Sequence, residues 1–338
     1  MSGDGFQERA TRTIRPLIPP DAEERVSRAV KQWNQVSREQ IRNETGLKLS
    51  DRENRDAIPV RVDGGFPASL AQLIDQHDDP VLWMLLMGQP KIGGLIEGLE
   101  LLLPVWDQFE GWPLLPDAAR DGRPFLERSR EIASVLQGVA LMRRVQDEIC
   151  GIEEDILGSY MFSARGSSIA IYWMPIAMVA AMKNVRIEDL AVVVLLHELT
   201  HGYTHLGRDI DGGQWESAGF GLSSRSVTEG LAQFYTAVVA EKLASRSAGV
   251  LRAYQGLLEL QSGAYRAHLD WLKGDARQRG ETVRFSMIAA RRQGTISYAA
   301  WVKIMEGTGD SLRRPGLARV ASSPDKSGYE RDGSESDD

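Results

Sequence analysis

The residues with the clearest capacity for chemistry lie at 197–201, where the sequence reads His-Glu-Leu-Thr-His. Histidines four residues apart on a helix are separated by about 40° around its axis, so both imidazoles can reach one ion. Glu198 lies about 60° from His201 around the same axis, so its carboxylate can approach a water on that ion without binding the ion. This pattern predicts a catalytic zinc site in which Glu198 acts as the general base.

The surroundings of this motif favour a metal site over the simpler alternative, a pair of histidines on a solvated helix surface. The five residues before His197 are Val-Val-Val-Leu-Leu, within a helix expected over Ile187–Leu206. An apolar helix of this kind would give the site dry walls.

A catalytic zinc ion takes three protein ligands and leaves one position open. Glu229 is the best third candidate, because it begins a second expected helix after a loop long enough to lay that helix across the first. The alternative is a glutamate that only complements the helix dipole. His205 is less suitable, since it has turned about 80° from His197. Asp209 and Asp211 follow the end of the first helix too closely to reach back.

The segments HELTH at 197–201 and TEGLAQFY at 228–235 together resemble the gluzincin branch of the zincin metallopeptidases. The resemblance covers roughly residues 155–245. It implies that His197, His201 and Glu229 bind zinc while Glu198 serves as the general base. It also implies an edge strand ahead of the site helix that pairs with extended substrate, and Ser168–Trp173 is the matching candidate.

The chain departs from the best-known gluzincins in two respects. The gap between His201 and Glu229 is longer, and Gln233 stands where the thermolysin-like pattern places an Asp that supports a histidine ligand. The metzincin pattern does not fit, because Thr204 and Gly207 occupy the positions where it requires Gly and His.

Two further residues are weaker candidates for catalytic roles. His205 could stabilise an oxyanion or contact substrate, or it could simply be satisfied by a neighbouring group. Tyr235 could donate a hydrogen bond to a tetrahedral intermediate, or it could pack as an ordinary core aromatic. Tyr203 and Tyr172 have the same two interpretations.

These residues predict a zinc-dependent metallopeptidase, a hydrolase that holds one zinc ion per chain and acts on a peptide or protein substrate. Zinc would lower the pKa of a bound water toward ~7. Glu198 would take its proton as the water attacks a peptide carbonyl, and would then deliver the proton to the leaving amine. Two alternatives stay open: a metal-containing binding or regulatory module without turnover, and a helical interaction protein with an accidental motif.

The bulk properties are ordinary for a globular enzyme and exclude several classes. The chain has 338 residues, a net charge of −7 and one cysteine, Cys150, so an intrachain disulfide is impossible. The acidic balance gives no general attraction to nucleic acid or anionic membranes. The sequence has no recognisable secretory signal and no apolar run of membrane-spanning length, so a cytoplasmic location is expected.

Four regions are expected along the chain: a flexible arm at 1–20, a mainly helical region of unknown role at 21–150, a zincin-like core at 151–312 and a disordered tail at 313–338. The core would contain strands at 156–162 and 168–173, the site helix at 187–206 and the ligand helix at 227–244. Residues 208–226 are expected to form a long loop, a candidate lid, and 249–272 one amphipathic helix. The predicted fold class is helix-rich α+β.

Overall fold

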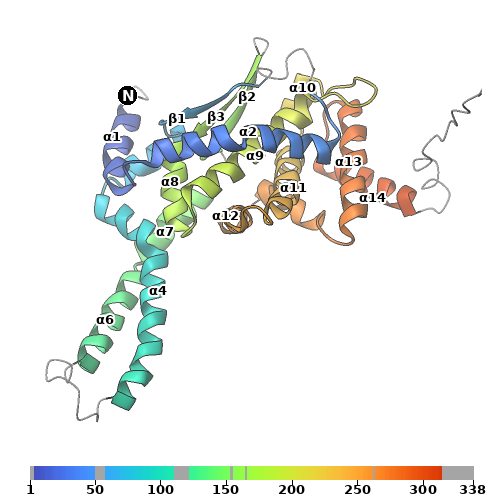
Figure 1. Cartoon of the computed structure of the whole chain (residues 1–338). Coiled ribbons are helices and arrows are strands. Elements are labelled where there is room, and N and C mark those ends of the chain that lie inside the picture. The colour runs from blue at the N-terminus through green and yellow to red at the C-terminus, as the bar shows by residue number, and fades with distance from the viewer. Residues whose placement is uncertain are drawn as a thin grey trace, which may run out of the picture.

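A computed structural model describes residues 4–49, 58–109, 122–152, 155–163, 166–261 and 263–313 (Figure 1). It shows a helix-rich α+β fold with one three-stranded sheet, which confirms the predicted class. The predicted tail lies almost wholly outside the described residues. The helices outside the site and the sheet include η1 (Arg15–Leu17), α7 (Ala140–Cys150), α8 (Trp173–Met182), α13 (Ala276–Gln293) and α14 (Tyr298–Arg313).

The sheet consists of β1 (Val60–Asp63), β2 (Gly158–Ser163) and β3 (Gly166–Tyr172), in the order β1-β3-β2. Strand β1 is parallel to β3, and β2 is antiparallel to it. The expectation that Ser168–Trp173 forms the edge strand is therefore wrong, because β3 has partners on both sides. The edge that adjoins the site helix belongs to β2. Local sequence patterns could not reveal this, since β1 comes from about a hundred residues earlier in the chain.

Helix α9 (Ile187–Leu206) carries the HExxH motif and lies at the centre of the molecule. Every residue from Asp189 to His205 is buried. Helix α2 (Ala22–Thr45) packs along one side of α9, α11 (Arg225–Leu243) crosses another side, and the sheet contacts a third. A helix that is apolar all round requires burial of this kind. The motif is therefore held in a dry and rigid setting.

The N-terminal residues differ from the flexible arm that the sequence predicts. Residues 4–14 form α1 (Asp4–Ile14), which packs on α3 (Ala68–Gln76). Ala10 and Ile14 are fully buried. They follow Phe6 at spacings of four residues, which places all three on one face of a helix. This stripe is short and lies among charged residues, which hid it in the sequence.

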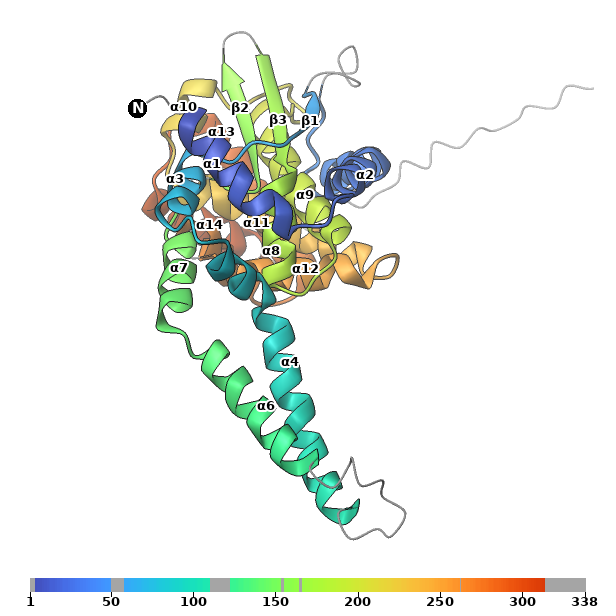
Figure 2. The same cartoon turned by 90° about the vertical axis from the view of Figure 1, so that its left-hand side faces the viewer.

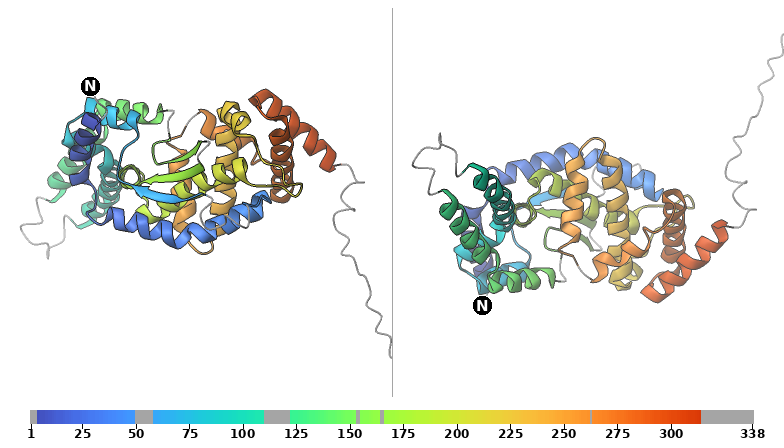
Figure 3. Two further views of the ribbon diagram at one scale, coloured as in Figure 1. Left: turned by 90° about the horizontal axis from the view of Figure 1, so that it is seen from above. Right: turned by 90° about the horizontal axis from the view of Figure 1, so that it is seen from below.

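The expected division at residue 151 does not separate two cores. Strand β1 from the N-terminal region completes the sheet, and α2 covers α9. Arg25 of α2 also donates to both carboxylate oxygens of Glu188 in the first turn of α9, at 2.8 and 2.9 Å. Figure 3 shows α2 running along one side of the body, with α13 and α14 at the end away from α1.

Helices α4 (Pro80–Phe109) and α6 (Gly122–Gln137) form a hairpin that projects from the body (Figure 2). The chain breaks at Gly138, between α6 and α7. Within the described residues, no helix is long and apolar enough to cross a membrane.

Two other expectations on the C-terminal side require correction. The expected loop at 208–226 contains α10 (Ser217–Leu222). The expected single helix at 249–272 is divided into α12 (Ala248–Leu258) and the 3-10 helix η2 (Gly263–Asp270). Helix η2 packs against α11, and this contact brings Tyr265 to the site described next.

Candidate metal centre

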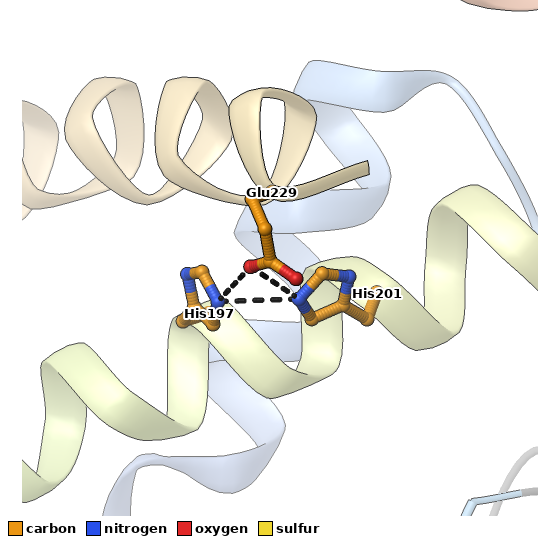
Figure 4. Close-up of side chains that lie close together, drawn as sticks. All are labelled: His197, His201 and Glu229. Atoms are coloured by element: carbon orange, nitrogen blue, oxygen red, sulfur yellow. Dashed lines mark hydrogen bonds and ion pairs between the residues drawn. The ribbon is translucent and has the colours of Figure 1, made fainter. Parts of the chain in front are cut away.

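Three buried side chains meet between α9 and α11, and together they could hold a metal ion (Figure 4). Nε2 of His197 lies 3.2 Å from Nε2 of His201. Oε2 of Glu229 lies 3.2 Å from the first of these nitrogens and 3.3 Å from the second. The structure therefore brings together the three residues that the sequence selected as metal ligands.

The spacing of these three atoms fits a small tetrahedral ion. Ligand atoms about 2.1 Å from zinc at tetrahedral angles lie about 3.4 Å apart. The three observed separations of 3.2–3.3 Å are close to this value. Helical spacing sets one side of the triangle, because residues i and i+4 share a face. The start of α11 supplies the third corner.

The electrostatics of the group favour the form of Glu229 that binds a cation. Burial alone would raise the pKa of this carboxyl, but the charges and hydrogen bonds of His201 and His197 outweigh that effect and lower the pKa. Burial likewise opposes the charged form of His201, yet the Glu229 carboxylate raises the pKa of this imidazole to about 9. The pocket is thus arranged around an ionised carboxylate and stabilises positive charge beside it.

Glu198 is next to this group but is not part of it. Its side chain is buried, and among the described residues Oε2 has no hydrogen-bond partner. Burial, and next the charge of Asp155, raise the pKa of this carboxyl well above its ordinary value. Gly158 of β2 allows the close approach, since a Cβ there would lie 3.0 Å from Oε1 of Glu198. A buried carboxylate with a free oxygen can accept a proton.

A second polar cluster, which the sequence reasoning missed, adjoins the three-residue group. Nη2 of Arg225 donates to the Tyr265 hydroxyl at 2.8 Å, and that hydroxyl donates to Oδ1 of Asp155. Nε of Arg225 lies 3.7 Å from Oε1 of Glu229, and the rings of Tyr265 and His197 are 6.0 Å apart. The i, i+4 spacing of Arg225 and Glu229 was a usable signal. Tyr265 and Asp155 offered none, because only the tertiary fold brings them here.

A cavity of about 400 Å³ lies beside His197 and Glu198. Its apolar walls come from α7, α8, α9, α12 and the segment before β2, through Ile149, Ile152, Leu157, Val179, Val193, Leu257 and Leu260. Asp155, Arg225 and Tyr265 supply polar groups to the same cavity. The arrangement is an apolar chamber with charged and hydrogen-bonding groups concentrated at the metal centre.

Gln233, where the family pattern has an acid, also faces this cavity. Its Nε2 donates to Oε1 of Gln261 at 2.9 Å. Nδ1 of His197 is buried, and the described residues give it no hydrogen-bond partner. Gln233 therefore does not make the hydrogen bond to a histidine that the Asp at this position makes in the thermolysin-like pattern.

His205 lies in an aromatic cluster next to the metal centre rather than in it. Its Nδ1 is 2.9 Å from the Tyr160 hydroxyl, and its Nε2 is 3.0 Å from Oγ of Ser217. Its ring stacks on Phe220 at 4.5 Å. Burial, and next the charge of Arg291, lower the pKa of this imidazole to about 4. Neighbouring groups therefore satisfy both ring nitrogens, which agrees with the second of the two interpretations that the sequence offered for His205.

The structure does not bring Tyr235 to the three-residue group. It lies six residues after Glu229 on α11, about 240° around the axis, and so points away from α9's ligands. Burial raises the pKa of its hydroxyl, and the charge of Arg284 offsets this only in part. The phenol rings beside the group are those of Tyr265, 6.0 Å from the His197 ring, and Tyr160, 6.4 Å from the His201 ring.

The aspartates after α9 take part in a turn. Oδ1 of Asp209 accepts from the backbone N–H of Asp211 at 3.0 Å and of Gly213 at 2.7 Å. Asp211 pairs with Arg292. Neither carboxylate belongs to the metal-competent group.

Comparisons with protein families, curated proteins and solved structures give no match for this chain.

Proposed function

We propose that this chain is a zinc-dependent metallopeptidase with a zincin-like, gluzincin-type centre. One observation carries the proposal: His197, His201 and Glu229 form a buried triangle of the right size for zinc, and Glu198 beside it has one unpartnered carboxyl oxygen. Two imidazoles and one carboxylate are a ligand set that hydrolytic zinc sites use. We expect one zinc ion per chain.

The roles of the chain's own residues follow from their positions. When bound, zinc supplies an activated water near neutral pH and polarises a carbonyl oxygen. Glu198 accepts the proton of the attacking water and returns it to the leaving amine. Its burial and raised pKa suit it to hold that proton between the two steps. Arg225 keeps Glu229 in place through the contact at 3.7 Å.

Tyr265 is the residue best positioned to donate a hydrogen bond to the developing oxyanion. Its hydroxyl is held between Arg225 and Asp155, and its ring lies 6.0 Å from that of His197. Turning the hydroxyl hydrogen from Asp155 to the substrate oxygen would place a fixed donor where negative charge develops. This assignment gives Tyr265 the oxyanion role for which the sequence suggested His205 or Tyr235.

The outer edge of β2, which pairs with no further strand in the described sheet, supports an extended peptide as the substrate. Tyr172 N–H donates to the Leu157 carbonyl at 2.9 Å, which fixes the alternation of the antiparallel ladder. The main-chain groups of Gly158, Tyr160 and Phe162 consequently point away from β3. A peptide added at this edge would run past Glu198, with an apolar side chain able to enter the neighbouring cavity.

A metal-containing binding module without turnover is the second candidate. The observation in its favour is the unpartnered Nδ1 of His197, since catalytic zinc ligands almost always have that nitrogen hydrogen-bonded. Such a module would hold zinc and bind a peptide along β2 without cleaving it.

One experiment separates these candidates from each other and from a protein without a metal. The wild type and Glu198→Gln are purified, their zinc content is measured, and both are incubated with a proteome-derived peptide library whose new termini are sequenced. Metallopeptidase activity predicts about one zinc in each protein, with new termini only in the wild type. Equal zinc and no new termini in either would favour the binding module. A zinc-free wild type that cannot be loaded would refute both.

A further inference from the structure

The hairpin of α4 and α6, called the arm below, leaves much apolar surface uncovered. Near its base α4 contacts α1, α7, α8 and η1, but α6 is the main partner of its outer half. Figures 1 and 2 show the arm extending well away from the body. Of the fifteen large apolar residues that are exposed in the described part of the chain, nine lie on the arm: Val81, Met84, Leu95, Leu101, Leu102, Val105, Phe125, Ile132 and Val135.

The exposed apolar residues of the two helices lie largely on one side of the arm. On α6, Phe125, Ile132 and Val135 fall within about 80° of one another around the axis. Leu99 of α4 and Ala133 of α6 are buried and mark the face that each helix turns toward the other. Viewed along each chain direction, the exposed apolar face of α4 and that of α6 are rotated from these residues in the same sense. Because the helices run antiparallel, equal senses of rotation bring both faces to the same side of the hairpin.

The opposite side of the arm is charged. Arg123 of α6 pairs there with Asp107 of α4 and with Glu127 one turn along its own helix. Glu97 and Glu100 of α4 are on the same side. The arm is therefore amphipathic as a unit, with one solvated face and one apolar face.

Three glycines open the apolar face of α4 to close approach. A Cβ added at Gly88, Gly94 or Gly98 would meet no atom within 4 Å. Glycines on a helix surface expose backbone and cost helix stability, so an open row of them is poorly explained by the arm alone. They leave shallow recesses, beside the projecting side chains of Leu101 and Leu102, that suit the packing of another helix.

The exposed area is sufficient for a stable interface. A large apolar side chain presents roughly 150–250 Å² when fully exposed. Seven of the nine arm residues, all but Val81 and Met84 near the base of α4, lie on the outer part of the arm and are 44–75% exposed. Toward the low end of that range of areas, they present on the order of 700 Å² per chain. Specific protein interfaces bury about 600–1,000 Å² per partner.

We propose that two copies of this chain associate through their arms, apolar face to apolar face, as an antiparallel four-helix bundle. A two-fold axis near residue 100 of α4 overlaps the outer parts of both arms and keeps the two bodies at opposite ends. In this register the recesses at Gly94 and Gly98 lie opposite large side chains of the other copy's α4. An isologous interface needs only this one self-complementary surface.

A second copy fits this face better than a lipid surface. Among the described residues of the arm, the charged groups on or beside the apolar stripe are Lys91, Arg128 and Glu131, and the last two already pair with each other at 3.0 Å. An interfacial amphipathic helix would instead carry an excess of Lys and Arg on its polar face. The polar side of this arm includes Glu97, Glu100, Asp107 and Glu127.

The test measures the mass of the full chain by sedimentation equilibrium over a range of concentrations. The wild type should be a dimer. Gly98→Arg should raise the dimer dissociation constant at least about tenfold, since a bulky charge then occupies the centre of the interface. This variant should fold, because the site has space and arginine favours helix over glycine. Leu102→Arg should act similarly.

The matched control is Ile210→Arg, which introduces the same charge at a residue that is 99% exposed and lies outside the arm. It should leave the dimer intact. Circular dichroism and zinc content should be unchanged in all three variants. A wild type that stays monomeric, or a dimer that Gly98→Arg does not weaken, would overturn the proposal. So would a monomer that co-sediments with phosphatidylcholine or phosphatidylserine vesicles through the same arm residues.

Discussion

Replacing Glu229 tests the metal centre most directly. Its Oε2 closes the triangle with the two imidazoles at 3.2 and 3.3 Å. Glu229→Gln retains the size of the side chain but removes the charge. Hydrogen-bond partners of metal ligands typically contribute 10–100-fold to affinity. Loss of a direct anionic ligand should therefore weaken zinc binding by at least about 100-fold, or about 2.7 kcal/mol.

Zinc affinity is measured by competition with a chromophoric chelator, and stability is measured in parallel by thermal unfolding with and without zinc. A ligand that binds only the folded state stabilises it by RT ln(1 + L/Kd), where L is the free ligand concentration. The variant should therefore lose most of the zinc-dependent rise in melting temperature. Asp211→Asn is the matched control, because it removes one carboxylate charge from an exposed side chain outside the group. It should bind zinc as the wild type does.

The measurement can refute the assignment. If Glu229→Gln binds zinc with unchanged affinity while an Asp209 or Asp211 variant is empty, the third ligand lies in the turn after α9. The gluzincin interpretation would then be wrong. If the double variant His197→Ala, His201→Ala retains stoichiometric zinc, the centre itself is misplaced.

Two further predictions concern Tyr265 and Glu188. Tyr265→Phe should retain zinc and lower kcat by about 10²–10³-fold with little change in KM, if its hydroxyl stabilises the oxyanion; an unchanged kcat in steady-state assays would exclude that role. Arg25 lowers the pKa of Glu188 to about 2 by its hydrogen bonds. A depressed carboxyl pKa contributes stability above the unfolded value and loses it as the pH falls toward the folded value. Glu188→Gln should thus cost about 2 kcal/mol at pH 7, after allowance for partial exposure. The difference from wild type in urea unfolding should shrink as the pH falls from about 4.5 to about 2; a constant difference would contradict this account.

The sequence predicted the metal-competent group well because its geometry is local. His197 and His201 are related by helical spacing alone, and the structure places α9 over Ile187–Leu206, the range that was expected. Glu229 needed only one more assumption, a second helix that folds back. Its first turn does lie against α9.

The polar cluster beside the group was not predictable in the same way. Periodicity favoured one helix over 249–272, with Tyr254 and Tyr265 on a common stripe. In the structure the chain leaves the α-helix at Leu258 and continues as η2. That break turns Tyr265 toward His197 while Tyr254 bonds to His268 at 2.7 Å. A helix end that tertiary packing determines leaves little trace in the sequence.

Local sequence patterns also could not predict which strand lies at the edge of the sheet and which lies at its centre. Strand β3 contains Ile169, Ala170 and Ile171, all fully buried, which is typical of a central strand covered on both faces. The sequence indicated a strand here, but the pairing partner β1 lies far away in the chain. The edge that we propose for substrate therefore belongs to β2 and not to β3, and a Cβ at Gly158 of β2 would lie 3.0 Å from the Glu198 side chain.

The position of the first 150 residues follows from the same contacts. They could have been a separate domain or a removable cover over the cleft. Helix α2 instead buries Val26, Ala29 and Val30, and it packs along α9, the helix that carries both histidines. Strand β1 completes the sheet. Removing this region would expose α9, which is buried along nearly its whole length, so these residues are an integral part of the core around the metal-competent group. Among the described residues the arm stands apart from that core, and no other described element covers its apolar face.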